Sequence, residues 1–176
     1  MRTDSIQLRP ATVVDVPTLE YWDCQPHVVA ATGADDKQDW REEIAKAEGP
    51  QKVLIAETGG RRIGVVQIID PALEVTHYWG DTESHQRALD IWIGEVADLS
   101  RGYGTRMMTL ALDLCFAPPD VTAVIIDPLT SNARAHRFYQ RLGFIPVEER
   151  VFGGTDLCLV HRLDRETWTT RSGGSG

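Results

Sequence analysis

Basic residues are scarce in this chain of 176 residues. Lysine and arginine number 18 against 26 aspartates and glutamates, which gives a net charge of −8. Nucleic-acid phosphates select basic surfaces, so this balance argues against a nucleic-acid partner. An acidic surface is compatible with a small cationic substrate, and equally with a role in solubility alone.

Long apolar runs are also missing. No stretch approaches the ~20 apolar residues that a membrane-spanning helix needs, and no apolar segment follows residues 1–5 to form a signal peptide. We therefore expect no membrane partner and a cytoplasmic location. The length and the apolar fraction of 42% predict one globular domain over 1–168. The Ser/Gly-rich end predicts a flexible tail over 169–176.

Only three cysteines occur, Cys24, Cys115 and Cys158, and no two of them form a Cys-x-x-Cys pair. The five histidines show no metal-ligand spacing, so we expect no metal site. Cys115 and Cys158 fall in the apolar patterns of an expected helix and strand. They are expected to be small buried side chains in a reducing compartment, and a catalytic thiol is the less favoured alternative.

Hydrophobic periodicity predicts strands and helices in mixed order. Strands are expected over 6–10, 52–57, 62–69, 88–96, 121–126, 144–150 and 155–162, and helices over 16–22, 40–48, 105–117 and 132–142. Asp15, Asp39 and Asn132 are the expected helix N-caps. Segments 27–36 and 72–87 show no clear period and are expected to be irregular. This order predicts an α/β (α+β mixed) fold, in which helices flank a twisted mixed sheet.

The run Leu99-Ser-Arg-Gly-Tyr-Gly-Thr105 lies between an expected strand and an expected helix. Gly102 and Gly104 allow backbone N–H groups to turn toward one point, and the helix start adds the positive end of its dipole. Such a cradle suits a pyrophosphate. A Gly-x-Gly pair by itself is weak evidence.

A second segment makes the pattern specific: Ser131-Asn-Ala-Arg-Ala-His-Arg-Phe-Tyr-Gln-Arg-Leu-Gly-Phe144. Together the two segments resemble the GNAT family of acetyl-CoA-dependent N-acyltransferases. The resemblance implies the GNAT fold, with a V-shaped opening between two central parallel strands, and acetyl-CoA as cosubstrate. Leu99 stands where the family has Gln or Arg, and Arg101 is displaced from that position by two residues.

The resemblance also implies which residues hold coenzyme A. They are Ile93, Arg101, Gly102, Tyr103, Gly104, Thr105, Asn132 and Arg134. Capping its helix is the alternative role for Asn132. Tyr139 lies near the end of the helix that matches the family's acid-bearing helix, so the resemblance implies that it is the acid. A phenol keeps its proton at neutral pH and can protonate the departing thiolate. The alternative is a core tyrosine packed at helical spacing.

Asp90 stands in the middle of an apolar strand, where a carboxylate is unfavourable unless it is paired or functional. We expect it to bind or deprotonate the attacking amine, with a structural ion pair as the alternative. Glu95 and Asp127 are further candidates. Other side chains expected at the acceptor site are Tyr78, Trp79, Asp81 and Trp92, although aromatic residues in such loops often serve packing alone.

Within the family, the segment from Tyr78 onward resembles the aminoglycoside 6′-N-acetyltransferases. This resemblance implies acetyl transfer to a primary amine of a small cationic acceptor, the 6′-amine of an aminoglycoside. Two alternatives stay open. One is N-acylation of siderophore precursors or protein N-termini, and the other is a catalytically silent coenzyme-A-binding module. A monomer and a homodimer are equally compatible with the sequence.

Overall fold

The computed structural model describes residues 5–33, 38–46, 49 and 51–173. In this part of the chain seven strands form a mixed sheet in the order β1-β2-β3-β4-β5-β7-β6, and helices flank it. The chain divides into two compact units. Unit 1 comprises Met1–Ile69 and Leu89–Leu114, and unit 2 comprises Asp70–Ala88 and Cys115–Gly176. The mixed α/β architecture expected from the sequence is confirmed, whereas the single domain over 1–168 and the V-shaped opening remain predictions.

An antiparallel sheet is the centre of unit 1. It contains β1 (Ile6–Pro10), β2 (Gln51–Thr58) and β3 (Arg61–Ile69). The turn between β2 and β3 is Gly59-Gly60, with φ of 56° and 77°. Glycine adopts these positive angles without strain, which suits a two-residue hairpin turn. Next to β3 lies the unit 1 part of β4 (Gln86–Ile93).

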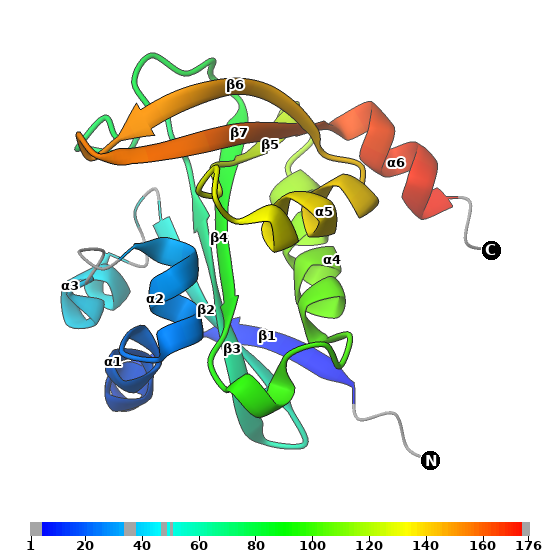
Figure 1. Ribbon diagram of the computed structural model, residues 1–176. Helices are drawn as coiled ribbons and strands as arrows, with labels where there is room; N and C mark the ends of the chain where they lie inside the picture. The colour runs from blue at the N-terminus through cyan, green and yellow to red at the C-terminus, as the bar shows by residue number, and fades with distance from the viewer. Residues whose placement is uncertain (1–4, 34–37, 47–48, 50, 174–176) are drawn as a thin grey trace. The chain divides into compact units, whose positions relative to one another are not determined.

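Helices cover both faces of the unit 1 sheet (Figure 1). On one face lie α1 (Val16–Asp23), α2 (Pro26–Thr32) and α3 (Trp40–Ala45). Their apolar residues form a core with the facing side chains of the sheet, namely Val16, Leu19, Trp22 and Trp40 with Val53, Ile55 and Val65. The other face is covered by α4 (Tyr103–Phe116). A Cβ placed on Gly64 of β3 would lie only 2.7 Å from the Met107 side chain, so α4 packs closely against this strand.

Some boundaries in unit 1 differ from the sequence prediction. The prediction of an irregular segment over 27–36 is wrong for residues 27–32, which belong to α2. Pro26 fixes a helical φ at the first position of α2, and burial of Val28 (2% exposed) holds the short helix in place. The helix expected over 40–48 is described as far as Ala45, and residues 47–48 lie outside the described part. The strand expected over 88–96 is shifted to Gln86–Ile93 and followed by the 3₁₀-helix η2 (Val96–Asp98).

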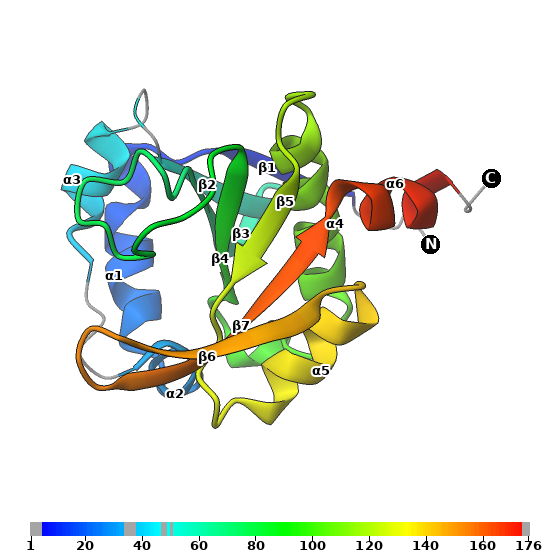
Figure 2. The ribbon, with the colours of Figure 1, turned by 90° about the horizontal axis from the view of Figure 1, so that it is seen from above.

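Unit 2 contains the other strands (Figure 2). The first residues of β4 pair in parallel with β5 (Ala123–Ile126), from Gln86 opposite Ala123 to Ala88 opposite Ile125. Antiparallel to β5 is β7 (Asp156–Asp164), which pairs in turn with β6 (Ile145–Phe152). Against this sheet packs α5 (Ala133–Arg141).

Two devices define α5 as predicted. The Asn132 side chain accepts a hydrogen bond from the Ala135 amide at 3.1 Å, which caps the N-terminus. Gly143 follows the C-terminus with φ of 100°, the left-handed conformation in which helices commonly end. The Phe144 amide then donates to the Tyr139 carbonyl at 3.1 Å, so the chain leaves α5 at a fixed point.

A last helix, α6 (Arg165–Gly173), was not expected from the sequence. Residues 169–173, predicted to belong to a flexible tail, are helical, and residues 174–176 lie outside the described part. Two arginines tie α6 down. Arg165 donates to the carbonyls of Val121 and Pro118 at 2.6 and 2.5 Å, and Arg171 donates to the Arg141 carbonyl at 2.7 Å. These long-range contacts outweigh the Ser/Gly-rich composition.

A buried carboxylate joins β1 and β3 to the start of α1. Asp15 is fully buried and accepts two hydrogen bonds from Arg9, both at 2.8 Å, and one from Arg62 at 2.7 Å. Asp15 occupies the N-cap position of α1, as expected, but its side chain makes no capping bond there. Hydrogen bonding from Arg9 is the largest cause that holds the pKa of Asp15 well below its ordinary value.

We expect Asp15→Asn to lower the free energy of unfolding by about 3 kcal/mol, because it removes the buried charge that holds Arg9 and Arg62. For a chain of this size that corresponds to a melting temperature lower by roughly 6–12 °C. Asp15 has a depressed folded-state pKa. Its contribution is therefore full above its unfolded-state pKa of about 4 and is lost as the pH falls below that value.

Thermal melts of the wild type and the variant between pH 3 and 8 measure this difference. The gap in melting temperature should be constant above about pH 5 and should narrow in acid. Asp39→Asn is the matched control, because Asn caps a helix as well as Asp does. A gap that is independent of pH would show that the charge of Asp15 is not what stabilises the fold.

Candidate functional site

The start of α4 forms an open backbone cradle in unit 1. Ser100 and Gly102 have φ of 61° and 79°, which turns the loop 99–102 into the helix. At the helix start the Arg106 amide donates to the Gly102 carbonyl at 3.3 Å. The N–H groups of residues 103–105 precede that bond and lie at the positive end of the helix dipole. A Cβ placed on Gly102 would meet nothing within 4 Å, so a ligand has room to approach the backbone.

A buried ion pair supports the same loop. Asp98, in η2, is 2% exposed, and Arg61 of β3 donates to both of its carboxylate oxygens at 2.6 and 2.9 Å. Arg101 lies 3.6 Å from Asp98 and stacks over the ring of Tyr103, with 59% of its side chain exposed. Arg101 and Tyr103 belong to the loop predicted from the sequence, whereas no sequence motif identifies Asp98 or Arg61.

The face of β4 that carries Asp90 also carries Trp92 and Gly94, as the strand alternation predicted. The Trp92 ring lies 5.8 Å from the ring of Trp40 in α3. A Cβ on Gly94 would overlap the Trp22 ring at 2.0 Å, so α1 packs directly on the backbone there. Asp90 itself is half-buried. This face therefore looks toward the α1 and α3 side of unit 1.

Two polar atoms near the end of β4 are buried without hydrogen-bond partners among the described residues. One is Trp92 Nε1, and the other is His27 Nδ1. The other ring nitrogen of His27, Nε2, lies 2.9 Å from the carbonyl oxygen of Ile93, a predicted coenzyme A residue. Buried polar groups nearly always have partners, so each of these two atoms is available to a water molecule or a ligand. His27 was missed because its segment was expected to be irregular.

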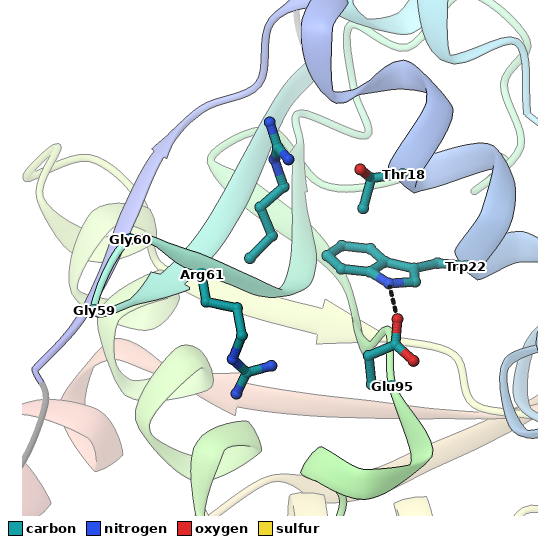
Figure 3. A pocket seen from close by; sticks show the side chains of 7 residues that line it. Thr18, Trp22, Gly59, Gly60, Arg61 and Glu95 are labelled. Carbon is teal, nitrogen blue, oxygen red and sulfur yellow. Dashed lines mark hydrogen bonds between the residues drawn. The ribbon is translucent and has the colours of Figure 1, made fainter.

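A pocket of about 430 Å³ also opens in unit 1 (Figure 3). Its lining residues are Thr18, Trp22, Glu95 and the hairpin residues Gly59, Gly60, Arg61 and Arg62. Trp22 Nε1 donates to Glu95 at 3.1 Å, the bond drawn in Figure 3. Glu95, a further candidate for the base, is thus engaged in holding Trp22. Neither Asp90 nor Trp92 lines this pocket.

In unit 2, Tyr139 is 9% exposed on the sheet-facing side of α5. Its ring lies 5.2 Å from Phe138, 5.8 Å from Phe144 and 6.3 Å from His161. The packing role left open for Tyr139 is therefore real, and the role as an acid remains a prediction. Arg134, one turn earlier, is exposed.

An aromatic cluster fixes the segment expected as an irregular loop before β4. Tyr78 stacks on Phe152 of β6 at 4.6 Å, and its hydroxyl donates to Asp127 at 2.9 Å. Trp79 is 2% exposed and packs edge-on against both rings, so its side chain serves packing rather than an open rim. Arg150 donates to the Trp79 carbonyl at 2.6 Å. Asp81 is exposed. No sequence motif identifies Phe152 or Arg150 as part of this cluster.

The three cysteines are free thiols that differ in burial. Cys115 and Cys158 are buried, as expected, and burial is the main cause that raises the pKa of the Cys158 thiol to about 12. Cys24 is exposed at the end of α1. Over the described ranges, no group of three or more His, Cys, Asp or Glu side chains has the arrangement of a metal site. None of the helices described there is long and apolar enough to span a bilayer.

Comparison with known proteins gives consistent matches. An acetyltransferase (GNAT) domain model matches residues 12–152. Aminoglycoside N(6′)-acetyltransferase type 1 of Klebsiella pneumoniae is 28% identical over 149 residues, which cover 80% of this chain and 74% of that protein. A kanamycin resistance protein of Rhizobium radiobacter is 34% identical over 73 residues, covering 41% of this chain and 68% of that protein.

Solved structures agree with this result. An aminoglycoside acetyltransferase AAC(6′)-Ib crystallised with coenzyme A superposes with a TM-score of 0.84 at 25% identity, covering 96% of this chain and 99% of that one. An aminoglycoside N(6′)-acetyltransferase of Legionella pneumophila superposes with a TM-score of 0.77 at 16% identity, covering 97% and 98%. The second likeness concerns the fold alone.

The cradle at the start of α4 predicts that Gly104→Val weakens acetyl-CoA binding by tenfold or more. The valine side chain occupies the space that the ligand needs beside the helix-start amides, and a tenfold change corresponds to about 1.4 kcal/mol. Isothermal titration calorimetry with acetyl-CoA measures the effect. Thr109→Val, further along α4, is the control for an apolar β-branched side chain placed outside the cradle. An unchanged affinity in folded Gly104→Val would remove the cradle from the site.

Proposed function

The chain belongs to the acetyltransferase (GNAT) domain family, and we propose that it transfers the acetyl group of acetyl-CoA to the 6′-amine of an aminoglycoside. The observation that carries the proposal is the open cradle at the start of α4. It lies in the same unit as the β4 face that bears Asp90 and Trp92. The acceptor class is supported by the relatives described above.

Acetyl-CoA fits the residues present. Its pyrophosphate is anionic and matches the amides of residues 103–105 at the positive end of the helix dipole. The exposed guanidinium of Arg101 supplies a formal positive charge beside that point. In unit 2, Asn132 and Arg134 stand at the start of α5, and we assign them to the same cosubstrate.

A polycationic acceptor fits the charge of the chain. The net charge is −8, and electrostatic attraction of this sign raises the rate at which a cation is encountered. Several carboxylates stand at the predicted acceptor positions. Asp90 is half-buried in unit 1, while Asp81 is exposed and Asp127 holds the Tyr78 hydroxyl in unit 2. Ammonium groups of an aminoglycoside are suitable partners for such carboxylates.

The reaction needs a neutral amine, a donor for the oxyanion that develops on the thioester, and a proton for the departing thiolate. We assign deprotonation of the ammonium to Asp90, acting through a water molecule. Trp92 Nε1 is a buried donor without a partner among the described residues and is available to the acceptor or to the acyl group. Tyr139 supplies the proton to the thiolate. Fixing amine and thioester together contributes a large share of the rate.

The experiment that tests the function is thiol release from acetyl-CoA with a panel of amine acceptors. The expected result is rapid release with an aminoglycoside carrying a 6′-amine and none with the analogue carrying a 6′-hydroxyl. Preference for peptide N-termini or for hydroxylamine and lysine side chains would replace the acceptor class. Binding of acetyl-CoA without release on any amine would reduce the chain to a coenzyme-A-binding module.

A cytoplasmic location belongs to this proposal, because acetyl-CoA is a cytoplasmic metabolite. The choice between a monomer and a homodimer remains a prediction that sedimentation of the purified protein decides.

Tyr139→Phe should lower kcat by roughly 10²-fold while acetyl-CoA affinity stays unchanged, since only the transferable proton is lost. Steady-state kinetics together with calorimetry separate the two quantities. Tyr21→Phe removes a hydroxyl from an exposed ring and serves as the control. A normal kcat in Tyr139→Phe, with chemistry shown to be rate-limiting, would leave the residue as packing alone.

Asp90→Asn should lower kcat/KM for the aminoglycoside by about tenfold to a hundredfold, because a charge-assisted contact of this kind contributes roughly 1.5–3 kcal/mol. Acetyl-CoA binding should stay nearly unchanged. Asp113→Asn, an exposed carboxylate of α4, is the control. Normal acceptor kinetics combined with a lower melting temperature would instead identify Asp90 as a structural ion-pair partner.

A further inference from the structure

We propose that Arg61, on β3, is a positioning residue for coenzyme A. It anchors the N-terminal end of the loop 99–102 through Asp98 and so keeps the helix-start amides and Arg101 turned toward the ligand. The inference rests on the proposed binding of acetyl-CoA at the start of α4. No motif points to Arg61, since it is 37 residues away from its partner Asp98 along the chain.

The first contact is at the N-terminal end of the loop. Arg61 directly follows the Gly59-Gly60 turn, so its backbone is held in the β2–β3 hairpin. Its guanidinium binds Asp98 in a two-pronged arrangement at 2.6 and 2.9 Å. Figure 3 shows this side chain extending away from the Trp22 ring. A planar fork on a carboxylate fixes orientation as well as distance, which a lysine does not do.

The C-terminal end of the loop is held by a stack, in which the Arg101 guanidinium lies 5.6 Å from the centre of the Tyr103 ring at the first residue of α4. The hydrogen bond to Asp98 is the largest cause that raises the pKa of Arg61 above its ordinary value. Between Asp98 and Tyr103, Ser100 is a non-glycine residue with a φ of 61°. Such a conformation is unfavourable and persists only where the surrounding structure holds it.

The brace also determines what Arg101 does. Both oxygens of Asp98 already accept from Arg61, and Arg101 remains 3.6 Å from the carboxylate with most of its side chain exposed. Without Arg61, the buried Asp98 would have Arg101 as its nearest cation and would draw it away from the ligand, because an unpaired buried charge is strongly unfavourable. Leu99 has no side-chain donor that could hold the loop. Arg61, on β3, supplies the hydrogen bonds that hold it through Asp98.

The neighbouring Arg62 is a matched control. It follows Arg61 directly, is also partly exposed and also pairs with a buried carboxylate. Its partner, however, is Asp15 at 2.7 Å, on the α1 side of the unit. Arg61→Gln and Arg62→Gln therefore remove the same charge and the same kind of ion pair. Only the first alters the loop.

The experiment measures dissociation constants by calorimetry for acetyl-CoA and for S-acetylpantetheine, which lacks the pyrophosphate. Arg61→Gln should weaken acetyl-CoA binding about tenfold and leave S-acetylpantetheine and the aminoglycoside within about twofold of wild type. Arg61→Lys should fall between, because it keeps the charge and loses the fork. Arg62→Gln should bind acetyl-CoA normally even where its melting temperature is lower.

Asp98→Asn distinguishes positioning from a direct contact between Arg61 and phosphate. Positioning predicts weaker acetyl-CoA binding in Asp98→Asn. It also predicts that the double variant Arg61→Gln/Asp98→Asn binds acetyl-CoA no more weakly than the weaker-binding single variant, since the two residues act as one unit. A direct contact predicts unchanged or tighter binding. Unchanged acetyl-CoA affinity in folded Arg61→Gln would overturn the inference. If Arg61→Gln does not fold, unchanged affinity in both Arg61→Lys and Asp98→Asn would overturn it. Absence of acetyl-CoA binding by the wild type would overturn the proposed function instead.

Discussion

The contact between Trp22 and the backbone of Gly94 is the constraint on which unit 1 depends. The ring lies so close that any side chain at position 94 would overlap it. This contact seats α1 on the end of β4, and Glu95 fixes the ring by accepting its N–H. The same strand then continues into η2 and the loop before α4. The side chains predicted to face the acceptor and the loop predicted to bind the cosubstrate therefore both lie along a segment that this packed glycine holds in place.

Local patterns predicted much of the fold, because local physics determines it. Alternation of apolar residues marked β2 and β3, and Asp39 and Asn132 cap their helices through contacts two or three residues away. The same reasoning missed α6, whose helix is held by Arg165 bonding to carbonyls more than forty residues distant. Composition indicates how a segment behaves alone, and it does not reveal which distant partner will hold it.

In the candidate site too, local sequence patterns identified some residues, and long-range contacts determined the others. The glycines of the loop could be predicted because glycine adopts backbone conformations that other residues avoid. Asp90 could be predicted because a carboxylate is unusual in the middle of an apolar strand. The pairs Arg61–Asp98 and His27–Ile93 join positions 37 and 66 residues apart. Nothing at either end distinguishes these residues from ordinary surface arginines or histidines. In unit 2, the stacking of Tyr78 on Phe152 likewise became apparent only when the hairpin β6–β7 brought the rings together.

The unequal burial of the three thiols gives this chain a practical property. Cys24 is exposed where α1 ends, whereas Cys115 and Cys158 are enclosed and the second is also hard to ionise. A maleimide dye or a nitroxide would therefore attach at one place without any engineered cysteine. That place is three residues before His27, whose ring contacts the end of β4. A probe there would report changes around that strand when a ligand binds, in the unaltered protein.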